Sequence, residues 1–412
     1  MSLRKNINYL TDFKKLIKWL LMGSLIFIFC FSSPLFSQDG FAIHLNLGVA
    51  YYHQGEYEKS KEEFKKAIQL NSKSFEAHYN LSLVYLAQEN FSLAEKELNE
   101  CLNLNPAYPE IHFQLGNVYF YQKLYSRAVD EYKKELDKNL SHVPSLYNLA
   151  KVFQIQGNIE EAEKFLRRVQ QISPEFPNIF ADLGEISYQQ GKKSEACEFL
   201  QKAIEKNNAN LLSYLYLGKI YQEEKDYQRA EKMILKAVEI EPGNFYAQLE
   251  LGYLYLEIKK YSLAISHLEK ATKINPDDLL AHYYLGYSCT QLKKFDQAIA
   301  QYSLILDKKE KFEDTYYRLG NLYYEKKDYK KAVFFYLKEL EINPQNRDAL
   351  FNLANVYFRE NRLGEAESSL KKLLEIVPDD VLAHSLLGDI YMRKNIYDKA
   401  IKEYEKAKAN KQ

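Results

Sequence analysis

Histidine, a common metal ligand, recurs at one fixed position of a 34-residue interval in this chain. Five of the eight histidines occupy that position: His44, His78, His112, His282 and His384. Three of them fall in consecutive intervals, which raises the question of a metal site. Zinc needs nitrogen ligands at about 2.1 Å, whereas packed helices lie about 8–10 Å apart. We therefore predict that these histidines pack between helices, and that the protein holds neither a metal nor a cofactor.

Other reactive side chains form no recognisable catalytic arrangement. The sequence has no convincing Ser-His-Asp set, no phosphate-binding loop and no CxxC pair. Chance pairs of Glu and His carry little weight in a chain with so many of both. Cys101, Cys197 and Cys289 are too widely spaced to form a disulfide, so we expect three small core residues. The protein is expected not to be an enzyme.

The interval is defined by a leucine followed by a small residue. The pair Leu47-Gly48 returns every 34 residues without an insertion. Its further copies are Leu81-Ser82, Leu115-Gly116, Leu149-Ala150, Leu183-Gly184, Leu217-Gly218, Leu251-Gly252, Leu285-Gly286, Leu319-Gly320, Leu353-Ala354 and Leu387-Gly388. Twelve residues after this pair comes another small residue, which is Ser60 in the first copy and Ala in every later one. Such strict self-similarity is typical of a repeat architecture.

One copy, residues 245–278, shows why the pattern predicts a pair of helices. Leu251 and Tyr255 are four residues apart and share one helical face. A second helix follows a polar break, and it ends at Pro276 because proline lacks an amide hydrogen. Gly252 and Ala264 are expected to be small because the two helices cross there. One pair cannot bury its apolar stripe alone, so the copies must stack.

This signature of Leu-Gly, Tyr, Ala and Pro at 34 residues resembles the tetratricopeptide repeat, and it covers residues 41–412. The resemblance implies an all-α fold, namely a right-handed superhelical solenoid of antiparallel helix pairs. The first helices would line a concave groove that binds a peptide segment of a partner. Eleven repeats are predicted: 41–74, 75–108, 109–142, 143–176, 177–210, 211–244, 245–278, 279–312, 313–346, 347–380 and 381–412.

By the same resemblance, the sixth residue of each repeat faces the groove. Side-chain amides fill that position in several repeats: Asn46, Asn80, Gln114, Asn148 and Asn352. Amides can donate and accept hydrogen bonds along an extended peptide backbone. The column resembles the asparagine ladder of the O-linked N-acetylglucosamine transferase superhelix. We predict a peptide-binding ladder, and solvated consensus residues are the alternative.

Aromatic side chains are expected on the same face towards both ends of the array: Tyr79, Phe113, Tyr147, Tyr283, Tyr317 and Phe351. A charged stretch that includes Lys151 and Glu185 lies between the two groups. Rings with polar edges suit binding surfaces because they bury a large area at low entropic cost. We predict two peptide-binding grooves separated by this stretch. Ordinary packing between repeats is the alternative.

Two further asparagines complete the predicted groove. Asn117 with Asn148, and Asn321 with Asn352, reproduce the amide half of the carboxylate clamp of chaperone-binding family members. The basic half is missing, because the following repeats offer no Lys or Arg at the required positions. We therefore do not expect binding of a carboxy-terminal EEVD-type tail.

The first 37 residues differ from the rest. Basic residues precede an uncharged apolar stretch from Trp19 to Phe31, and small residues follow it. This order is typical of an export signal, with cleavage after Ser37. The alternatives are an uncleaved anchor over residues 19–36, close to a bilayer span of about 20 residues, and a lipid-modified Cys30. In each version the remainder is predicted to be exported, to the periplasm or cell envelope.

Charge balance limits the kind of partner. Lys plus Arg equals Asp plus Glu at 56 each, whereas nucleic-acid binding needs a concentrated basic face. We expect no nucleic acid, and membrane contact only through the amino-terminal segment. The predicted function is a non-catalytic scaffold or assembly factor that binds peptide segments of other proteins. An accessory role in handling or exporting envelope polysaccharide is the alternative.

Overall fold

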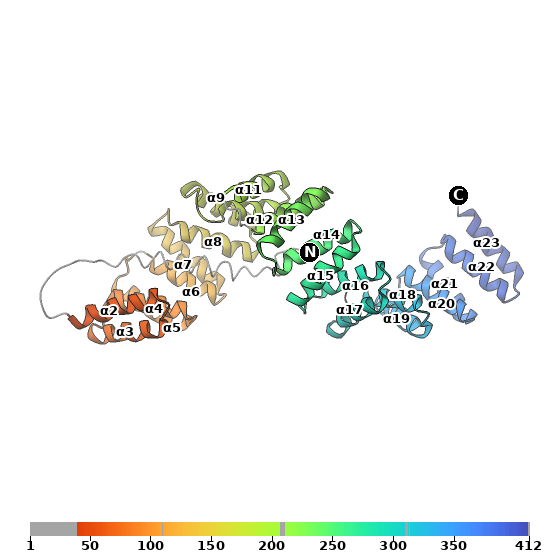
Figure 1. Cartoon of the computed structure of the whole chain (residues 1–412), viewed down its shortest axis with the longest axis horizontal. Helices are drawn as coiled ribbons and strands as arrows, with labels where there is room; N and C mark the ends of the chain where they lie inside the picture. The colour runs from red at the N-terminus through yellow and green to blue at the C-terminus, as the bar shows by residue number, and fades with distance from the viewer. Residues whose placement is uncertain (1–38, 109, 207–210, 310–311, 313, 411–412) are drawn as a thin grey trace. The chain divides into compact units, whose positions relative to one another are not determined.

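The computed structural model describes residues 39–108, 110–206, 211–309, 312 and 314–410 (Figure 1). Across these ranges the chain forms twenty-two α-helices and no strand. The predicted all-α fold of successive helix pairs is confirmed. The predicted export segment, residues 1–37, lies outside the described residues. Within the part that is described, no helix is both long and apolar enough to cross a membrane.

The chain divides into two compact units, residues 1–216 and 217–412, and the division falls within one helix, α12 (Leu211–Glu223). The described helices of the first unit that precede α12 are α2 (Asp39–His53), α3 (Tyr57–Leu70), α4 (Phe75–Ala87), α5 (Phe91–Leu104), α6 (Ile111–Tyr121), α7 (Tyr125–Lys138), α8 (Val143–Gln156), α9 (Ile159–Ile172), α10 (Ile179–Gln189) and α11 (Lys193–Lys206). Each even-numbered helix is the first helix of a repeat.

The second unit repeats the same arrangement. Its helices after α12 are α13 (Tyr227–Ile240), α14 (Phe245–Glu257), α15 (Tyr261–Ile274), α16 (Leu279–Gln291), α17 (Phe295–Lys308), α18 (Thr315–Glu325), α19 (Tyr329–Ile342), α20 (Arg347–Arg359), α21 (Leu363–Ile376), α22 (Val381–Arg393) and α23 (Tyr397–Ala409). Helices of one pair pack most closely on each other, and each pair then packs on its neighbour (Figure 1).

The turn inside each pair contains a residue in the left-handed backbone conformation. It is always the fifteenth residue of the repeat, and it is Gly55, Gly157 or Gly191 in three of them. In the others φ lies between 57° and 62° although the residue carries a side chain: Glu89, Lys123, Lys225, Lys259, Lys293, Lys327, Asn361 and Asn395. The sequence indicated only a polar break here.

Short polar side chains start many of the first helices. Ser74, Asn244, Asp278, Asn346 and Asp380 each accept a hydrogen bond from a backbone amide three residues later, at 2.8–3.1 Å. Such capping satisfies one of the free amide hydrogens at a helix start. Each of these residues ends a 34-residue repeat, so the caps restart the chain as the next pair.

The small residue of the signature makes room for a side chain of the second helix. A Cβ atom on Gly252 would lie 2.6 Å from Cγ of Leu268, and one on Gly116 would lie 2.4 Å from Cε1 of Tyr132. We expected Gly252 and Ala264 to lie at one crossing. Gly252 faces Leu268 of the second helix and Ala264 is fully buried, in agreement with this expectation.

The core is a row of leucines that continues from pair to pair. The signature leucine is at most 4% exposed in every repeat from the second to the eleventh. Leu47, in the first, is 40% exposed because no helix pair of the described chain precedes it. In the first unit the buried cluster continues without a break from Val49 to Phe199. Stacking therefore supplies the burial that one pair lacks.

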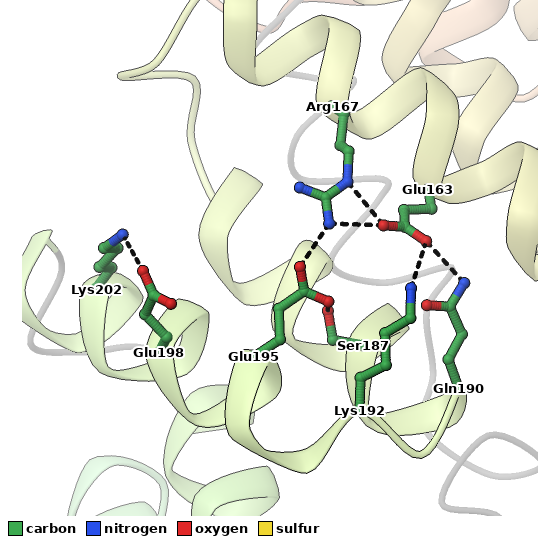
Figure 2. A network of polar contacts seen from close by, with 8 residues as sticks. All are labelled: Glu163, Arg167, Ser187, Gln190, Lys192, Glu195, Glu198 and Lys202. Carbon is green, nitrogen blue, oxygen red and sulfur yellow. Dashed lines mark hydrogen bonds and ion pairs between the residues drawn. The ribbon is translucent and has the colours of Figure 1, made fainter.

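Polar side chains also join neighbouring pairs. Figure 2 shows Glu163 of α9 accepting hydrogen bonds from Arg167 at 2.7 Å and from Gln190 at 2.8 Å. Arg167 donates in turn to Glu195 of α11 at 2.7 Å. Burial would raise the pKa of Glu163, but the bonds from Gln190 and Arg167 lower it on balance. The network fixes the fourth repeat against the fifth.

Candidate functional site

The predicted groove residues all lie on first helices, in two groups. The amino-terminal group lies on α2, α4, α6 and α8: Asn46, Tyr79, Asn80, Phe113, Gln114, Asn117, Tyr147 and Asn148. The carboxy-terminal group lies on α16, α18 and α20: Tyr283, Tyr317, Asn321, Phe351 and Asn352. Each group lies within one unit.

In the amino-terminal group, three amides bond to one another. Oδ1 of Asn117 accepts hydrogen bonds from the Tyr132 hydroxyl at 2.8 Å and from Nδ2 of Asn148 at 2.9 Å. Nδ2 of Asn117 donates to Oε1 of Gln114 at 3.1 Å. All four side chains are buried, at no more than 1% exposure. The network joins the third repeat to the fourth.

The amides of this group differ in how far they can be reached. Asn46 is exposed and Asn80 is half-buried, whereas Gln114 and Asn148 are enclosed. Nε2 of Gln114 and Oδ1 of Asn148 have no hydrogen-bond partner. Leaving such atoms unpaired in the interior costs roughly 1–3 kcal/mol each. A ligand could reach these two atoms only if neighbouring side chains moved.

The aromatic rings of the amino-terminal group are buried. The Tyr79 hydroxyl donates to Oε2 of Glu110 at 3.2 Å, and burial raises the pKa of Tyr79 well above its usual range. The Phe113 ring lies against Tyr132, and the Tyr147 hydroxyl donates to Oδ2 of Asp182 at 2.7 Å. The Tyr79 and Tyr147 bonds join neighbouring repeats, whereas the contact of Phe113 with Tyr132 lies within the third repeat.

The charged stretch after this group contains a buried ion pair. Nζ of Lys151 lies 2.5 Å from Oδ1 of Asp182, and both side chains are almost fully enclosed. Nζ also lies 5.3 Å from the centre of the Tyr147 ring. Nearby, Glu185 accepts a hydrogen bond from the Tyr216 hydroxyl at 2.8 Å. Removing one partner of a buried pair is costly, so these charges are tied to the fold.

The carboxy-terminal group repeats the same amide network with more exposure. Oδ1 of Asn321 accepts hydrogen bonds from the Tyr336 hydroxyl at 2.7 Å and from Nδ2 of Asn352 at 2.9 Å. Here both asparagines, together with Tyr317 and Phe351, remain half-buried. Their polar edges therefore stay within reach of a ligand.

Arginines that the sequence interpretation missed lie among these rings. Nε of Arg318 donates to the Tyr283 hydroxyl and to Oδ1 of Asp314, both at 2.8 Å. Arg359 lies over the Tyr324 ring at 5.4 Å. In the same way, Arg393 lies over Phe358 at 3.8 Å. Arg318 could have been found, because it is the sixth residue of its repeat, in the column that holds the amides. The surface therefore carries guanidinium groups as well as aromatic rings.

The recurrent histidines bond across their own helix pair. Nδ1 of His44, His78, His112 and His384 lies 2.5–2.7 Å from a glutamate on the second helix of the same repeat. In the eighth repeat His282 meets Gln301 instead, at 2.7 Å. Among the described residues, no group of three metal-binding side chains comes together.

Stacked helix pairs with this geometry define a helical-repeat protein, and comparison with known families specifies which kind. Family models of the tetratricopeptide repeat match residues 48–89, 75–108, 323–390 and 382–410. Two models named after larger proteins also match: the anaphase-promoting complex, cyclosome, subunit 3 over 223–303, and the tetratricopeptide repeat protein 21 C-terminal ARM domain over 120–244. The chain is a tetratricopeptide-repeat protein, a class whose arrays serve as protein-interaction scaffolds.

Solved structures of similar fold are distant in sequence. A human IFIT1 dimer with PPP-AAAA is 18% identical, with 94% of this chain and 98% of that chain covered and a TM-score of 0.43. The APC/C hetero-tetramer Cut9-Hcn1 is 13% identical, covering 91% and 94%, with a TM-score of 0.41. MamA is 20% identical over 42% of this chain and 94% of that chain, with a TM-score of 0.38. A search of curated proteins found no matching relative.

Proposed function

We propose that this protein is a non-catalytic scaffold that binds extended segments of partner proteins on the first helices of its second unit. The observation that supports this is the half-exposed carboxy-terminal group, Tyr283, Tyr317, Asn321, Phe351 and Asn352. Half-exposed amides offer hydrogen bonds to any peptide backbone, and the rings beside them bury apolar side chains. The equivalent amino-terminal amides Gln114 and Asn148 are enclosed by neighbours.

The arginines favour a segment that carries acidic or aromatic residues. Arg359 is exposed and lies over Tyr324. A guanidinium held on a ring pairs with a carboxylate in a defined orientation. Asp314 is the N-cap residue of α18, which carries Arg318, and Asp389 lies on α22, which carries Arg393. These carboxylates repel a strongly acidic chain. The expected ligand is an extended segment with isolated acidic residues.

The test is selection of peptides from a random library on the full chain, followed by affinity measurements on variants. Asn352→Ala should weaken the selected peptides at least tenfold. Asn148→Ala is the matched control, because Asn148 donates to Asn117 in the first unit as Asn352 donates to Asn321 in the second. Both variants should lose similar stability, whereas only Asn352→Ala should lose affinity.

Methylation of the peptide backbone gives an independent measurement. If side-chain amides hold the main chain, N-methylated versions of the same peptides should bind at least tenfold less tightly. Equal affinity of methylated and unmethylated peptides, or equal loss in both asparagine variants, would remove the amides from the binding mechanism.

Export to the cell envelope is a separate proposal, and its support lies in residues 1–37 of the sequence. The mass of the protein recovered from each cell fraction distinguishes a cleaved export signal from an uncleaved membrane anchor. Loss of residues 1–37 from a periplasmic form supports a cleaved signal, and an intact chain in the membrane fraction supports an anchor. Recovery of the intact chain in the cytoplasm would contradict export.

A protein partner, rather than nucleic acid, is part of the proposal. The 56 basic and 56 acidic residues leave no net positive charge to attract phosphates. Titration with a single-stranded RNA that carries a 5′-triphosphate should give no salt-dependent binding. Micromolar binding that weakens steeply with salt would replace the peptide proposal with a nucleic-acid one.

A further inference from the structure

In most repeats one pair of side chains bridges the two helices. The fourth residue lies on the first helix, and it faces the twenty-third residue on the second. The pair is histidine with glutamate in the first repeat, where His44 meets Glu63 at 2.5 Å. It is a pair of rings in the fifth repeat, where Phe180 and Phe199 lie 6.5 Å apart, and in the ninth, where Tyr316 and Phe335 lie 6.3 Å apart.

The tenth repeat departs from this rule. Its twenty-third residue is Ser369, whereas the others carry long or aromatic side chains there: Glu63, Glu97, Glu131, Phe165, Phe199, Met233, His267, Gln301, Phe335 and Glu403. The hydroxyl of Ser369 donates to the carbonyl oxygen of Glu365 in its own helix, at 3.0 Å. It therefore makes no bridge to Leu350, the fourth residue of this repeat.

A cavity of about 560 Å³ lies beside Ser369. Its inner wall includes the buried residues Leu350, Leu353 and Tyr357, and its rim includes Leu337 of α19 and Ile376 of α21. The two rim residues are 42% and 39% exposed. The volume exceeds that of a phenylalanine side chain, so the cavity can take a whole ring.

The neighbouring repeats show what shape fits. In the ninth, Phe335 lies parallel to Tyr323 at 5.3 Å, and Nζ of Lys331 lies 4.9 Å from the same ring. In the fourth, Phe165 lies parallel to Phe153 at 5.7 Å. The equivalent ring of the tenth repeat is Tyr357, which has Arg362 over it at 4.3 Å. Its aromatic partner from the second helix is replaced by Ser369.

We propose that this cavity binds an aromatic side chain presented by another protein, which takes the place that Phe335 and Phe165 fill in their own repeats. A protein segment, rather than a free small molecule, suits the exposed apolar rim, because Leu337 and Ile376 can pack against residues on either side of the ring. Lys372 and Glu375 at the rim have opposite charges, so the segment needs no strong charge of its own. This site is independent of the proposed peptide surface on the first helices.

The test uses the full chain and two capped tripeptides, acetyl-Gly-Phe-Gly-amide with a fluorinated ring and acetyl-Gly-Leu-Gly-amide. Fluorine NMR should show millimolar binding of the phenylalanine peptide, and the leucine peptide should compete at least fivefold less well. Ser369→Phe should weaken binding at least tenfold. Ser194→Phe, at an exposed position of α11, should leave binding unchanged.

A second pair of variants guards against misfolding. Ser369→Glu places at this position the residue that four other repeats carry there, and it should also abolish binding. It replaces Ser369→Phe in the test if that variant fails to fold. Phe335→Ser should open an equivalent cavity beside Tyr323 and raise the number of bound peptides from one to two. No binding by the natural chain, equal binding by the two peptides, or unchanged binding by the folded Ser369 variants would each overturn the proposal.

Discussion

Tyrosines at the twenty-fourth position of a repeat donate to an asparagine or aspartate where one stands at the ninth position. Tyr132 and Tyr336 donate to Asn117 and Asn321, and Tyr404 donates to Asp389 at 2.6 Å. The eighth repeat has Tyr302 but offers no such acceptor, and the buried Tyr302 hydroxyl has no partner. One hydroxyl therefore stabilises or destabilises its repeat according to a residue fifteen positions earlier.

This contrast predicts opposite effects of the same substitution. Tyr132→Phe removes the bond to Asn117 and leaves a buried carbonyl oxygen with fewer donors, so it should destabilise the first unit by about 1–2 kcal/mol. Tyr302→Phe removes an unpaired buried hydroxyl and should be neutral or slightly stabilising. Urea unfolding of both variants measures the two changes. A larger loss for Tyr302→Phe would contradict the hydrogen-bond assignment.

Glu367 predicts a dependence on pH. Burial would raise its pKa, but hydrogen bonds from Lys371, Lys394 and Tyr391 lower it to about 2, from an ordinary value of 4.5. A carboxylate whose pKa is lower in the folded state stabilises the fold above its unfolded pKa and loses that effect as the pH falls through its folded pKa. Partial exposure reduces the effect to about 1 kcal/mol.

The measurement compares the natural chain with Glu367→Gln across pH. At pH 7 the natural chain should be more stable by that amount, and the difference should shrink steadily as the pH falls from 4.5 towards 2. A stability difference that stays constant over this range would show that the variant acts through packing rather than charge.

The sequence could predict which side chains lie on the first helices, but not which of them a partner can reach. Gln114 and Asn352 belong to the same predicted column, yet one is enclosed and the other half-exposed. Their exposure depends on the bulk of side chains in the adjacent repeats, and a repeat consensus does not contain that information. Peptide binding by either residue stays a prediction.

The succession of helix pairs is the part of the fold that the sequence predicted best, because one pattern is repeated eleven times. Apolar spacing, small residues at the crossing and proline after the second helix all agree on the same boundaries. The left-handed residue in the turn was not predicted. Lys225, Lys259, Lys293 and Lys327 do not favour that conformation, and the glycines at the same position in three repeats were the available signal.

These lysines predict a stabilising substitution. Lys259 has φ of 61°, a conformation that costs a residue with a side chain roughly 1 kcal/mol relative to glycine. Lys259→Gly should therefore stabilise the seventh repeat by about 0.5–1 kcal/mol. Lys260→Gly is the matched control and should give no gain, because Lys260 has φ of −85°. The comparison is read from denaturation midpoints, and equal shifts for both variants would contradict the strain argument.

At the scale of the whole molecule, the principal contacts run between helices that are adjacent or next-but-one along the chain. Stability in such an array is a sum of repeat terms and nearest-neighbour interface terms. A substitution that destabilises one repeat should therefore destabilise its neighbours and leave distant repeats unchanged. In a globular domain with one shared core, the same substitution would destabilise the whole domain.

Gly116→Ala tests this local behaviour. The new Cβ would lie 2.4 Å from the Tyr132 ring, whose hydroxyl is held by Asn117, so the ring cannot move aside cheaply. We expect a loss of about 1–3 kcal/mol for such overpacking. Hydrogen exchange should speed up in α4 to α9 and stay unchanged in α18 to α23. Gly243→Ala, in the turn before α14 and with open space around it, should alter neither region. Uniformly faster exchange along the chain would contradict a nearest-neighbour array.

The stacking of like units also decides how the protein would respond to a pulling force. A load applied at the two ends passes through each interface in series, so the weakest repeat yields first while the others stay intact. Each repeat that yields would release roughly 100 Å of extended chain, given about 3.3–3.6 Å per residue over 34 residues. Under tension the protein would therefore lengthen in even steps, in the manner of an extensible tether.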